Sequence, residues 1–173
     1  FSAYGGEYSA KVEVTYAEPP KVDYITVAQA IATAPDTQVT VKGIVGPSLV
    51  NQNGFYLFSE EGDMIAVKAL NKDEMFANLS IGNEVILKGM RERYVKNDAS
   101  AFAGQTCIVK AEILQNNYGN HAYSTEKFVE TTAADFYALD ANVDYSTTVF
   151  VFTATIEVEE TAFYTKLLVK SGS

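Results

Sequence analysis

Residue types that support catalysis and metal binding are scarce in this chain. It contains no Trp, one Cys and one His among 173 residues. The lone Cys107 excludes an internal disulfide framework and a zinc site of several thiolates, and its apolar neighbours predict a buried position. A Ser-His-Asp or Cys-His centre would depend on His121, which lies in a polar stretch and is expected to be solvated. We therefore expect no catalytic residues, no metal site and no cofactor, and we predict that the protein is not an enzyme.

Long apolar runs and a surplus of positive charge are also missing. No apolar run approaches the ~20 residues that span a bilayer, so no membrane insertion is expected. The formal net charge is −9, and it is unevenly spread. Residues 21–118 carry nine Lys and Arg against eleven Asp and Glu, whereas residues 119–173 carry three against eight. Such a chain repels a polyanion unless its few cations converge on one face.

The N-terminal segment lacks the basic region and apolar core of a secretory leader. We expect either that a leader has been removed or that the chain is a piece of a longer protein, and we favour the second. Apolar and polar residues alternate from Tyr8 to Tyr16, which is the period of a half-buried strand. Pro19 and Pro20 then break regular structure. Residues 1–20 are therefore predicted to be a strand and a linker, and the strand is a candidate for the end of a preceding domain.

Aromatic and β-branched residues, by contrast, are abundant. The chain has 10 Phe and 11 Tyr together with many Val and Thr, a composition typical of β-rich proteins. A short helix is predicted before the first long β pattern. Thr26 suits its N-cap, and Gln29 three residues later completes a capping box. Pro35 ends the helical pattern.

Five segments after this helix have the patterns of β-strands. They cover residues 38–45, 54–59, 64–70, 85–94 and 105–114. A helix-compatible stretch at 71–79 separates the third from the fourth, and Gly43 and Gly89 stand where strands of a small barrel must curve. This order is that of the OB fold, named for oligonucleotide and oligosaccharide binding. We predict a mainly β protein with a five-stranded OB-type β-barrel and short helices over residues 21–118; a five-stranded open sheet is the alternative.

The acidic segment at residues 119–173 repeats the beginning of the barrel pattern. A capped helix is predicted at Thr132, and residues 148–156 and 162–167 alternate like the first two barrel strands. One interpretation is a truncated second OB-like unit, and the other is a β-hairpin appended to a single domain. A half barrel exposes strand edges, so its strands would have to pair with something, and the predicted strand at 8–16 is one candidate.

Five short patterns between Tyr24 and Leu114 carry a family resemblance. They are Ile-Thr-Val-Ala-Gln-Ala at 25–30, Val-Thr-Val-Lys-Gly-Ile-Val at 39–45, Gly-Phe-Tyr-Leu at 54–57, Ile-Ala-Val at 65–67 and Leu-Ser-Ile-Gly-Asn-Glu-Val-Ile-Leu-Lys-Gly at 79–89. Together they resemble bacterial OB-fold domains of secreted and cell-surface proteins. The resemblance implies an extracellular or cell-surface location and an accessory role beside other domains of the same polypeptide. The family pattern often has Asp where Asn83 stands, but Asn serves equally in a turn.

Aromatic and basic residues beside the predicted core indicate a ligand surface. We predict that six apolar side chains are buried together: Phe55, Leu57, Ile65, Val67, Val85 and Leu87. Tyr56 then points outward, where it can stack on a base or a sugar ring. The candidate ligand-binding residues come from the second, third and fourth strands: Tyr56, Lys68, Arg91, Arg93 and Tyr94. A surface held by salt bridges is the alternative interpretation of these residues.

Two functions are compatible with these patterns. The first is a non-catalytic accessory or structural module of a larger bacterial exported or surface protein. The second is a weak binding domain for single-stranded nucleic acid or oligosaccharide. Each stacked base contributes ~1–3 kcal/mol, so two stacks against an acidic field predict low affinity at best.

Overall fold

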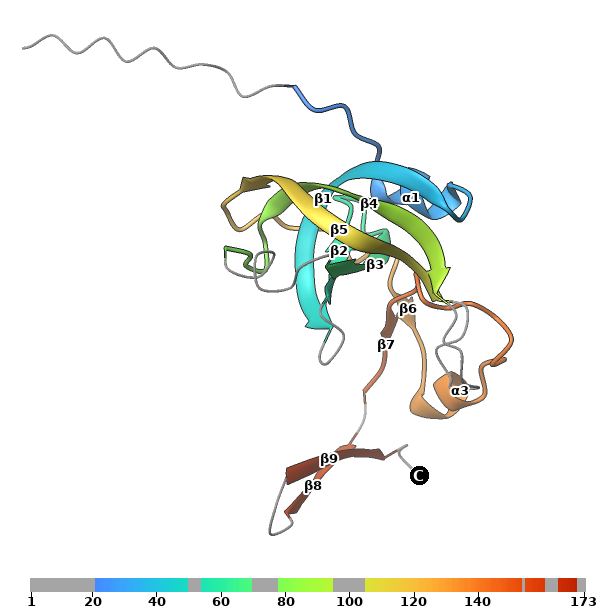
Figure 1. Cartoon of the computed structure of the whole chain (residues 1–173). Coiled ribbons are helices and arrows are strands. Elements are labelled where there is room, and N and C mark those ends of the chain that lie inside the picture. The colour runs from blue at the N-terminus through green and yellow to red at the C-terminus, as the bar shows by residue number, and fades with distance from the viewer. Residues whose placement is uncertain are drawn as a thin grey trace, which may run out of the picture.

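Figure 1 shows the arrangement of the chain in the computed structural model, which has a barrel followed by a smaller C-terminal part. The described residues are 21–49, 54–69, 78–94, 105–153, 155–160 and 165–170. Within them, five strands close into a barrel in the order β1-β2-β3-β5-β4, with β4 pairing back onto β1. The protein is therefore mainly β and contains an OB-like barrel, as predicted.

Helix α1 (Val27–Ala32) precedes the barrel strands and is capped as the sequence predicts. The Thr26 hydroxyl accepts a hydrogen bond from the Gln29 amide at 3.2 Å, and the Gln29 side chain accepts one from the Thr26 amide at 2.9 Å. These bonds satisfy two of the amides that a helix N-terminus leaves without partners. Just before the cap, Ile25 forms a parallel bridge with Val41, which fixes the start of the helix against the barrel.

The barrel strands differ in length and in the way they pair. They are β1 (Thr37–Leu49), β2 (Gly54–Phe58), β3 (Met64–Ala69), β4 (Glu84–Tyr94) and β5 (Gln105–Asn117). All neighbours are antiparallel except β3 and β5, whose parallel pairing closes the barrel. The first half of β1 pairs with β4 and the second half with β2, and Ile44 faces a partner on both sides. The long strand β1 therefore connects β4 on one side to β2 on the other.

The inner face of these strands forms the core that the alternation predicts. All six residues expected to be buried together are 1% exposed or less and belong to one cluster: Phe55, Leu57, Ile65, Val67, Val85 and Leu87. Val27 and Ala30 of α1 are fully buried in the same cluster, so the helix adds to the barrel core. Cys107 is also fully buried, as predicted. Burial of each large aliphatic side chain stabilises the fold by about 1.5–3 kcal/mol.

Glycine positions in the barrel walls allow close contact between strands. A Cβ on Gly43 would lie 2.7 Å from Leu57 Cγ, and one on Gly89 would overlap Ile108. Pro47 lies within β1 at a register shift between Val45 and Ser48, where the missing amide hydrogen of proline is tolerated.

The C-terminal part contains short elements after the barrel. They are β6 (Val129–Glu130), α3 (Ala133–Tyr137), β7 (Phe150–Val151), β8 (Thr155–Glu160) and β9 (Thr165–Lys170). Strands β6 and β7 are parallel, whereas β8 and β9 form an antiparallel hairpin that stands apart from the barrel in Figure 1.

Some predicted elements fall wholly or partly outside the described residues. They include the strand at 8–16, residues 71–77 of the predicted helix and residues 162–164 of the last predicted strand.

Candidate functional site

Tyr56 and Lys68 lie on the outer side of β2 and β3, as the strand register predicts. Tyr56 stands opposite Ala66, and Lys68 stands opposite Gly54. Tyr56 is only half-exposed, because its side chain packs against a small apolar cluster that includes Ala66 and the buried Cys107. The tyrosine therefore contributes to packing on the barrel wall and is less open than an outward stacking platform requires.

Arg91 has a different position from the one predicted for it. It shares the inner face of β4 with Leu87 and is only 6% exposed. Its guanidinium donates to the carbonyl oxygens of Ala30 at 3.1 Å and Ile31 at 3.2 Å, and also to Glu92 O at 2.7 Å. The last carbonyls of a helix lack intrahelical partners, and a cation there is favourable. Arg91 therefore fastens α1 to the barrel and is not available to a ligand on the surface.

Arg93 and Tyr94 lie at the end of β4. Arg93 is exposed, and its Cα faces Thr106 across the pair with β5. Tyr94 is the last residue of β4 and pairs with Gln105. The structure thus separates the five predicted site residues: two lie on the outer wall of β2 and β3, one lies inside and two lie at a strand end. The loops at 50–53 and 95–104, which border the ligand face in OB folds, lie outside the described residues.

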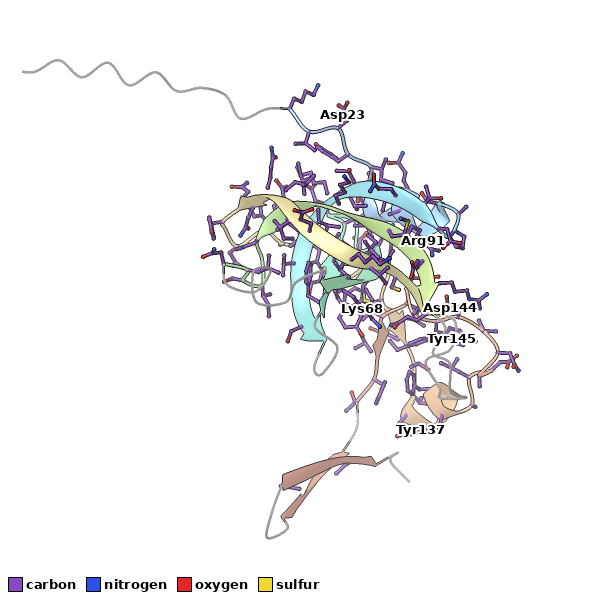
Figure 2. The ribbon with its side chains drawn as sticks, viewed as in Figure 1. Asp23, Lys68, Arg91, Tyr137, Asp144 and Tyr145 are labelled. Atoms are coloured by element: carbon purple, nitrogen blue, oxygen red, sulfur yellow. The ribbon has the colours of Figure 1, made fainter. Side chains whose placement is uncertain are left out.

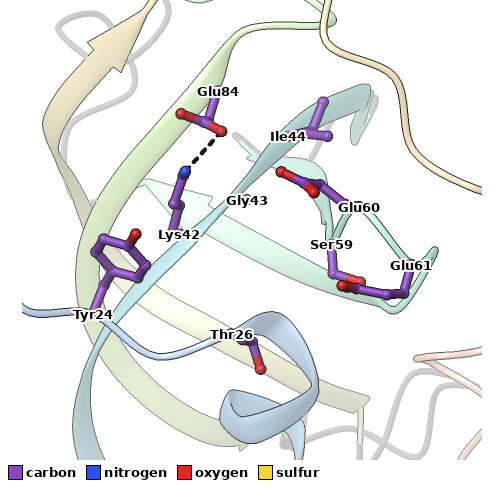
Figure 3. Close-up of a pocket in the computed structure, with 9 residues that line it drawn as sticks. All are labelled: Tyr24, Thr26, Lys42, Gly43, Ile44, Ser59, Glu60, Glu61 and Glu84. Carbon is purple, nitrogen blue, oxygen red and sulfur yellow. Dashed lines mark ion pairs between the residues drawn. The ribbon is translucent and has the colours of Figure 1, made fainter.

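A shallow hollow of about 220 Å³ lies on another part of the barrel, shown in Figure 3. Residues of β1, the start of β4, the β2–β3 turn and the segment before α1 form its walls. They are Tyr24, Thr26, Lys42, Gly43, Ile44, Ser59, Glu60, Glu61 and Glu84. The Tyr24 side chain is 48% exposed, and three carboxylates surround a single ammonium group. The hollow therefore repels an anionic ligand, and its carboxylates can accept hydrogen bonds.

Lys42 stands between two other residues of this hollow. Its Nζ lies 2.9 Å from a Glu84 carboxylate oxygen and 5.6 Å from the centre of the Tyr24 ring. The hydrogen bond to Glu84 is the largest influence on the pKa of Lys42, and it raises that pKa above its ordinary value. Lys42 is therefore fully protonated near neutral pH, and its charge is compensated within the protein.

The segment after β5 is fastened to the barrel along its length. We call residues 118–128 the connector. The Tyr123 ring stacks on Phe58 with centroids 3.9 Å apart and planes 6° apart, and Phe128 lies beside the same pair. Two backbone bonds add to this contact: the His121 amide donates to Gly82 O at 2.9 Å, and the Ser124 amide donates to Glu60 O at 2.8 Å. The outward end of β2 is therefore covered by the connector.

The β2–β3 turn is shaped to receive the connector. Gly62 has a φ of +91°, and a Cβ there would overlap the Ser124 carbonyl oxygen. Beside it, Lys127 Nζ lies 2.7 Å from Asp63 Oδ1. Burial raises the pKa of Asp63, but the hydrogen bonds from Lys127 and Ser59 outweigh this effect and hold the pKa below its ordinary value. Charge, ring stacking and backbone bonds thus act at one junction.

A second junction joins the C-terminal part to the start of β5. The Asp144 carboxylate accepts hydrogen bonds from the Thr106 hydroxyl at 2.8 Å and the Thr106 amide at 3.2 Å, and Ser146 Oγ accepts from the same amide at 2.8 Å. In Figure 2, Asp144 lies next to the end of the barrel. Burial raises the pKa of Asp144, whereas bonds from Ser146 and Thr106 lower it more, so the net shift is downward.

Sequence reasoning missed both junctions. It expected His121 to lie solvated in a polar stretch. A signal was present in Tyr123 and Phe128, two aromatic residues in an otherwise polar linker. Aromatic residues in a linker indicate a surface against which the linker packs.

The described residues contain no group of three or more His, Cys, Asp or Glu side chains placed to hold a metal ion. Among them, no helix combines the length and the apolar composition that crossing a membrane requires.

Comparison with known proteins gives one structural likeness. No family model matches the chain, and no curated protein matches it. A solved structure titled as the hypothetical protein ygiW from E. coli is similar at 15% sequence identity. The match covers 55% of this chain and 94% of that protein, with a TM-score of 0.37. The OB-like assignment therefore rests on the strand order of the barrel itself.

Proposed function

We propose that the barrel is a non-catalytic structural module that holds a neighbouring β unit at a fixed place within a larger protein. The observation that carries this proposal is the fastening of the connector, where the stacked Phe58 and Tyr123 rings lie 3.9 Å apart. An aromatic pair of this kind contributes about 0.5–1.5 kcal/mol beyond the burial of its area. The Asp63–Lys127 ion pair and the Asp144–Thr106 bonds act in the same sense. A flexible tether would need none of these contacts.

The fate of Arg91 supports a structural role over nucleic-acid binding. Arg91 was a candidate ligand-binding residue, but its guanidinium is hydrogen-bonded to backbone carbonyl oxygens of α1 and β4. The chain also has a net charge of −9, which opposes the approach of a polyanion. The resemblance to domains of bacterial exported proteins supports placing the module outside the cell. Protease treatment of intact cells should remove it, and protection inside the cytosol would contradict that location.

The fastening is tested by a double substitution in the connector, Tyr123→Ala with Lys127→Ala. In the unaltered protein, backbone ¹⁵N relaxation should give the barrel and residues 129–151 a common rotational correlation time. The double variant should lose the stacked pair and the ion pair, so residues 129–151 should gain mobility relative to the folded barrel, although Thr106 still bonds to Asp144 and Ser146. Tyr118→Ala is the matched control, because Tyr118 lies in the same connector and is 65% exposed. Separate tumbling in the unaltered protein would refute the proposal.

A second candidate function is the binding of a neutral oligosaccharide in the hollow of Figure 3. The Tyr24 ring favours it, because an exposed aromatic ring stacks on a sugar ring and the surrounding carboxylates can accept hydrogen bonds from hydroxyl groups. Titration with a panel of neutral oligosaccharides should shift amide resonances around Lys42 and Glu84. The Tyr24→Ala variant should lose the shifts, and Tyr137→Ala, which alters an exposed tyrosine elsewhere, should keep them. Shifts that persist in Tyr24→Ala, or no shifts with any member of the panel, would remove this candidate.

A further inference from the structure

The C-terminal part repeats the local structure that begins the barrel. In the barrel, Ile25 pairs in parallel with Val41, and Thr26 then caps α1. In the C-terminal part, β6 pairs in parallel with β7, and Thr132 then caps α3. The two capping bonds match: the Asp135 amide donates to Thr132 Oγ1 at 3.1 Å, and the Gln29 amide donates to Thr26 Oγ1 at 3.2 Å. Each helix is thus followed by a strand that pairs with the residues before its cap.

The next elements continue the same order. In the barrel, the single strand β1 pairs both with Ile25 and with β2. In the C-terminal part these two pairings are divided between β7, which pairs with β6, and β8, which forms an antiparallel pair with β9, so β7 and β8 together take the place of β1. The barrel then adds β3, β4 and β5, so that β1 gains β4 as a second neighbour and β2 gains β3. Among the described strands, β8 and β9 pair only with each other. Both therefore have a backbone edge that no described strand occupies.

Apolar side chains in this part are more open than their counterparts in the barrel. Val27 and Ala30 of α1 are fully buried, whereas Phe136 and Tyr137 of α3 are 36% and 70% exposed. Most of the large exposed apolar residues of the described chain lie here: Val129, Phe136, Tyr137, Val143, Val151 and Val158. Figure 2 shows Tyr137 in this part of the molecule, away from the barrel.

These residues already include the start of a core. Phe136 packs on Phe150 and Phe152, each with ring centroids 5.4 Å away, and Tyr145 lies 5.7 Å from Phe150. Ala133 of the same helix is only 4% exposed. A cluster with one packed side and one open side is what remains when the first elements of a barrel lack the later ones. Exposed apolar surface and open strand edges of this kind mark a place where further strands add.

We propose that residues 128–170 are the first helix and first two strands of a second OB-like barrel, completed by further β-strands from the same polypeptide on the C-terminal side of β9. We place the missing strands after β9 because, in the first barrel, the strands β3, β4 and β5 that complete it all follow β2 in the chain. The charge of β8 adds an expectation about its partner. Strand β8 carries Glu157, Glu159 and Glu160. The strand that pairs with the open edge of β8 should therefore be rich in Lys or Arg.

Hydrogen exchange on two chains tests the proposal. The first is the 173-residue chain, in which the amides of β8 and β9 should exchange at least about 100-fold faster than those of β1 and β2. The second carries an additional copy of residues 64–117, the β3–β5 segment of the first barrel, attached after Ser173. This extension should slow exchange in β8 and β9 by at least about tenfold in a monomeric protein. The matched control is the same extension with Val85→Asp and Leu87→Asp in the copy, which should give no protection.

Three results would overturn the proposal. Protection of β8 and β9 equal to that of β1 in the monomeric 173-residue chain would show a hairpin that is complete without further strands. Protection that grows with protein concentration would assign the open edges to a second copy of the chain. Unchanged exchange in the extended chain would show that strands of this type do not add. None of these measurements depends on the connector, so the proposed spacing role is tested separately by its own double variant.

Discussion

At the scale of single residues, the position of a side chain within a strand decides whether a cation can serve a ligand. Arg91 and Arg93 are two residues apart on β4, so they belong to the same face of the strand. Arg91 lies beneath α1 and is 6% exposed, whereas Arg93 lies nearer the strand end and is exposed. Two side chains on the same face of one strand, two residues apart, thus differ in environment: the first is buried and the second is exposed to solvent.

Replacement of Arg91 should therefore be costly. Arg91→Met removes the guanidinium donors to the carbonyl oxygens of Ala30 and Ile31 at a largely buried site, and we expect a loss of about 2–4 kcal/mol in the free energy of unfolding. Arg93→Met is the matched control and should change stability by about 0.5 kcal/mol or less. Urea denaturation of both variants measures the difference. Equal effects of the two substitutions would show that the bonds to α1 contribute little.

At the scale of elements, the two capped helices make similar local bonds in different surroundings. Helix α1 buries Val27 and Ala30 in the barrel core, whereas α3 leaves Phe136 partly open. Local sequence produces both helices, because the N-cap threonine and the first turn suffice to start them. Their contribution to stability depends on what each helix packs against.

Removal of the two caps should therefore have different effects on the barrel. Thr26→Ala should lower barrel stability by about 1 kcal/mol, within the usual range for loss of a helix N-cap. Thr132→Ala should leave the barrel transition unchanged, because α3 contributes nothing to the barrel core. Thermal unfolding followed by the near-ultraviolet signal of the tyrosines, together with barrel amide exchange, distinguishes the two. A barrel destabilised equally by Thr132→Ala would mean that the two parts unfold as one unit.

At the scale of the whole molecule, two carboxylates link the C-terminal part to the barrel. Asp63 bonds to Lys127 of the connector, and Asp144 bonds to Thr106 of β5. The pKa of each carboxyl lies below its ordinary value of 3.8 in the folded protein. A group with a depressed folded pKa gives stability that is present above the unfolded value and is lost as pH falls through the folded value.

Both junctions should consequently loosen only in acid. We expect the amide resonances of Ser124 and Thr106 to be constant above pH 3.8 and to move toward those of a detached segment as the pH falls below that value. Asp63→Asn should abolish the change at Ser124 while preserving the change at Thr106, and Asp144→Asn should do the reverse. Loosening between neutral pH and the ordinary pKa would contradict the downward shifts.

Sequence alone was sufficient for the elements whose pattern is local. Alternation in β2, β3 and β4 identified six residues of the barrel core, and the Thr26–Gln29 pair identified the start of α1. Such features follow from the period of a strand and from the amides at a helix end. The number of barrel strands and their order along the chain could be predicted for the same reason.

Tertiary structure alone decided which surfaces remain open. Tyr56 was predicted outward and does face out of the barrel, but the packing of neighbouring strands half-buries it. Arg91 was predicted to face a ligand, but a helix from a distant part of the chain takes its hydrogen bonds. The connector covers the outer end of β2 through contacts between residues far apart in sequence. Periodicity specifies the two faces of each strand, whereas only the path of the whole chain determines what covers them.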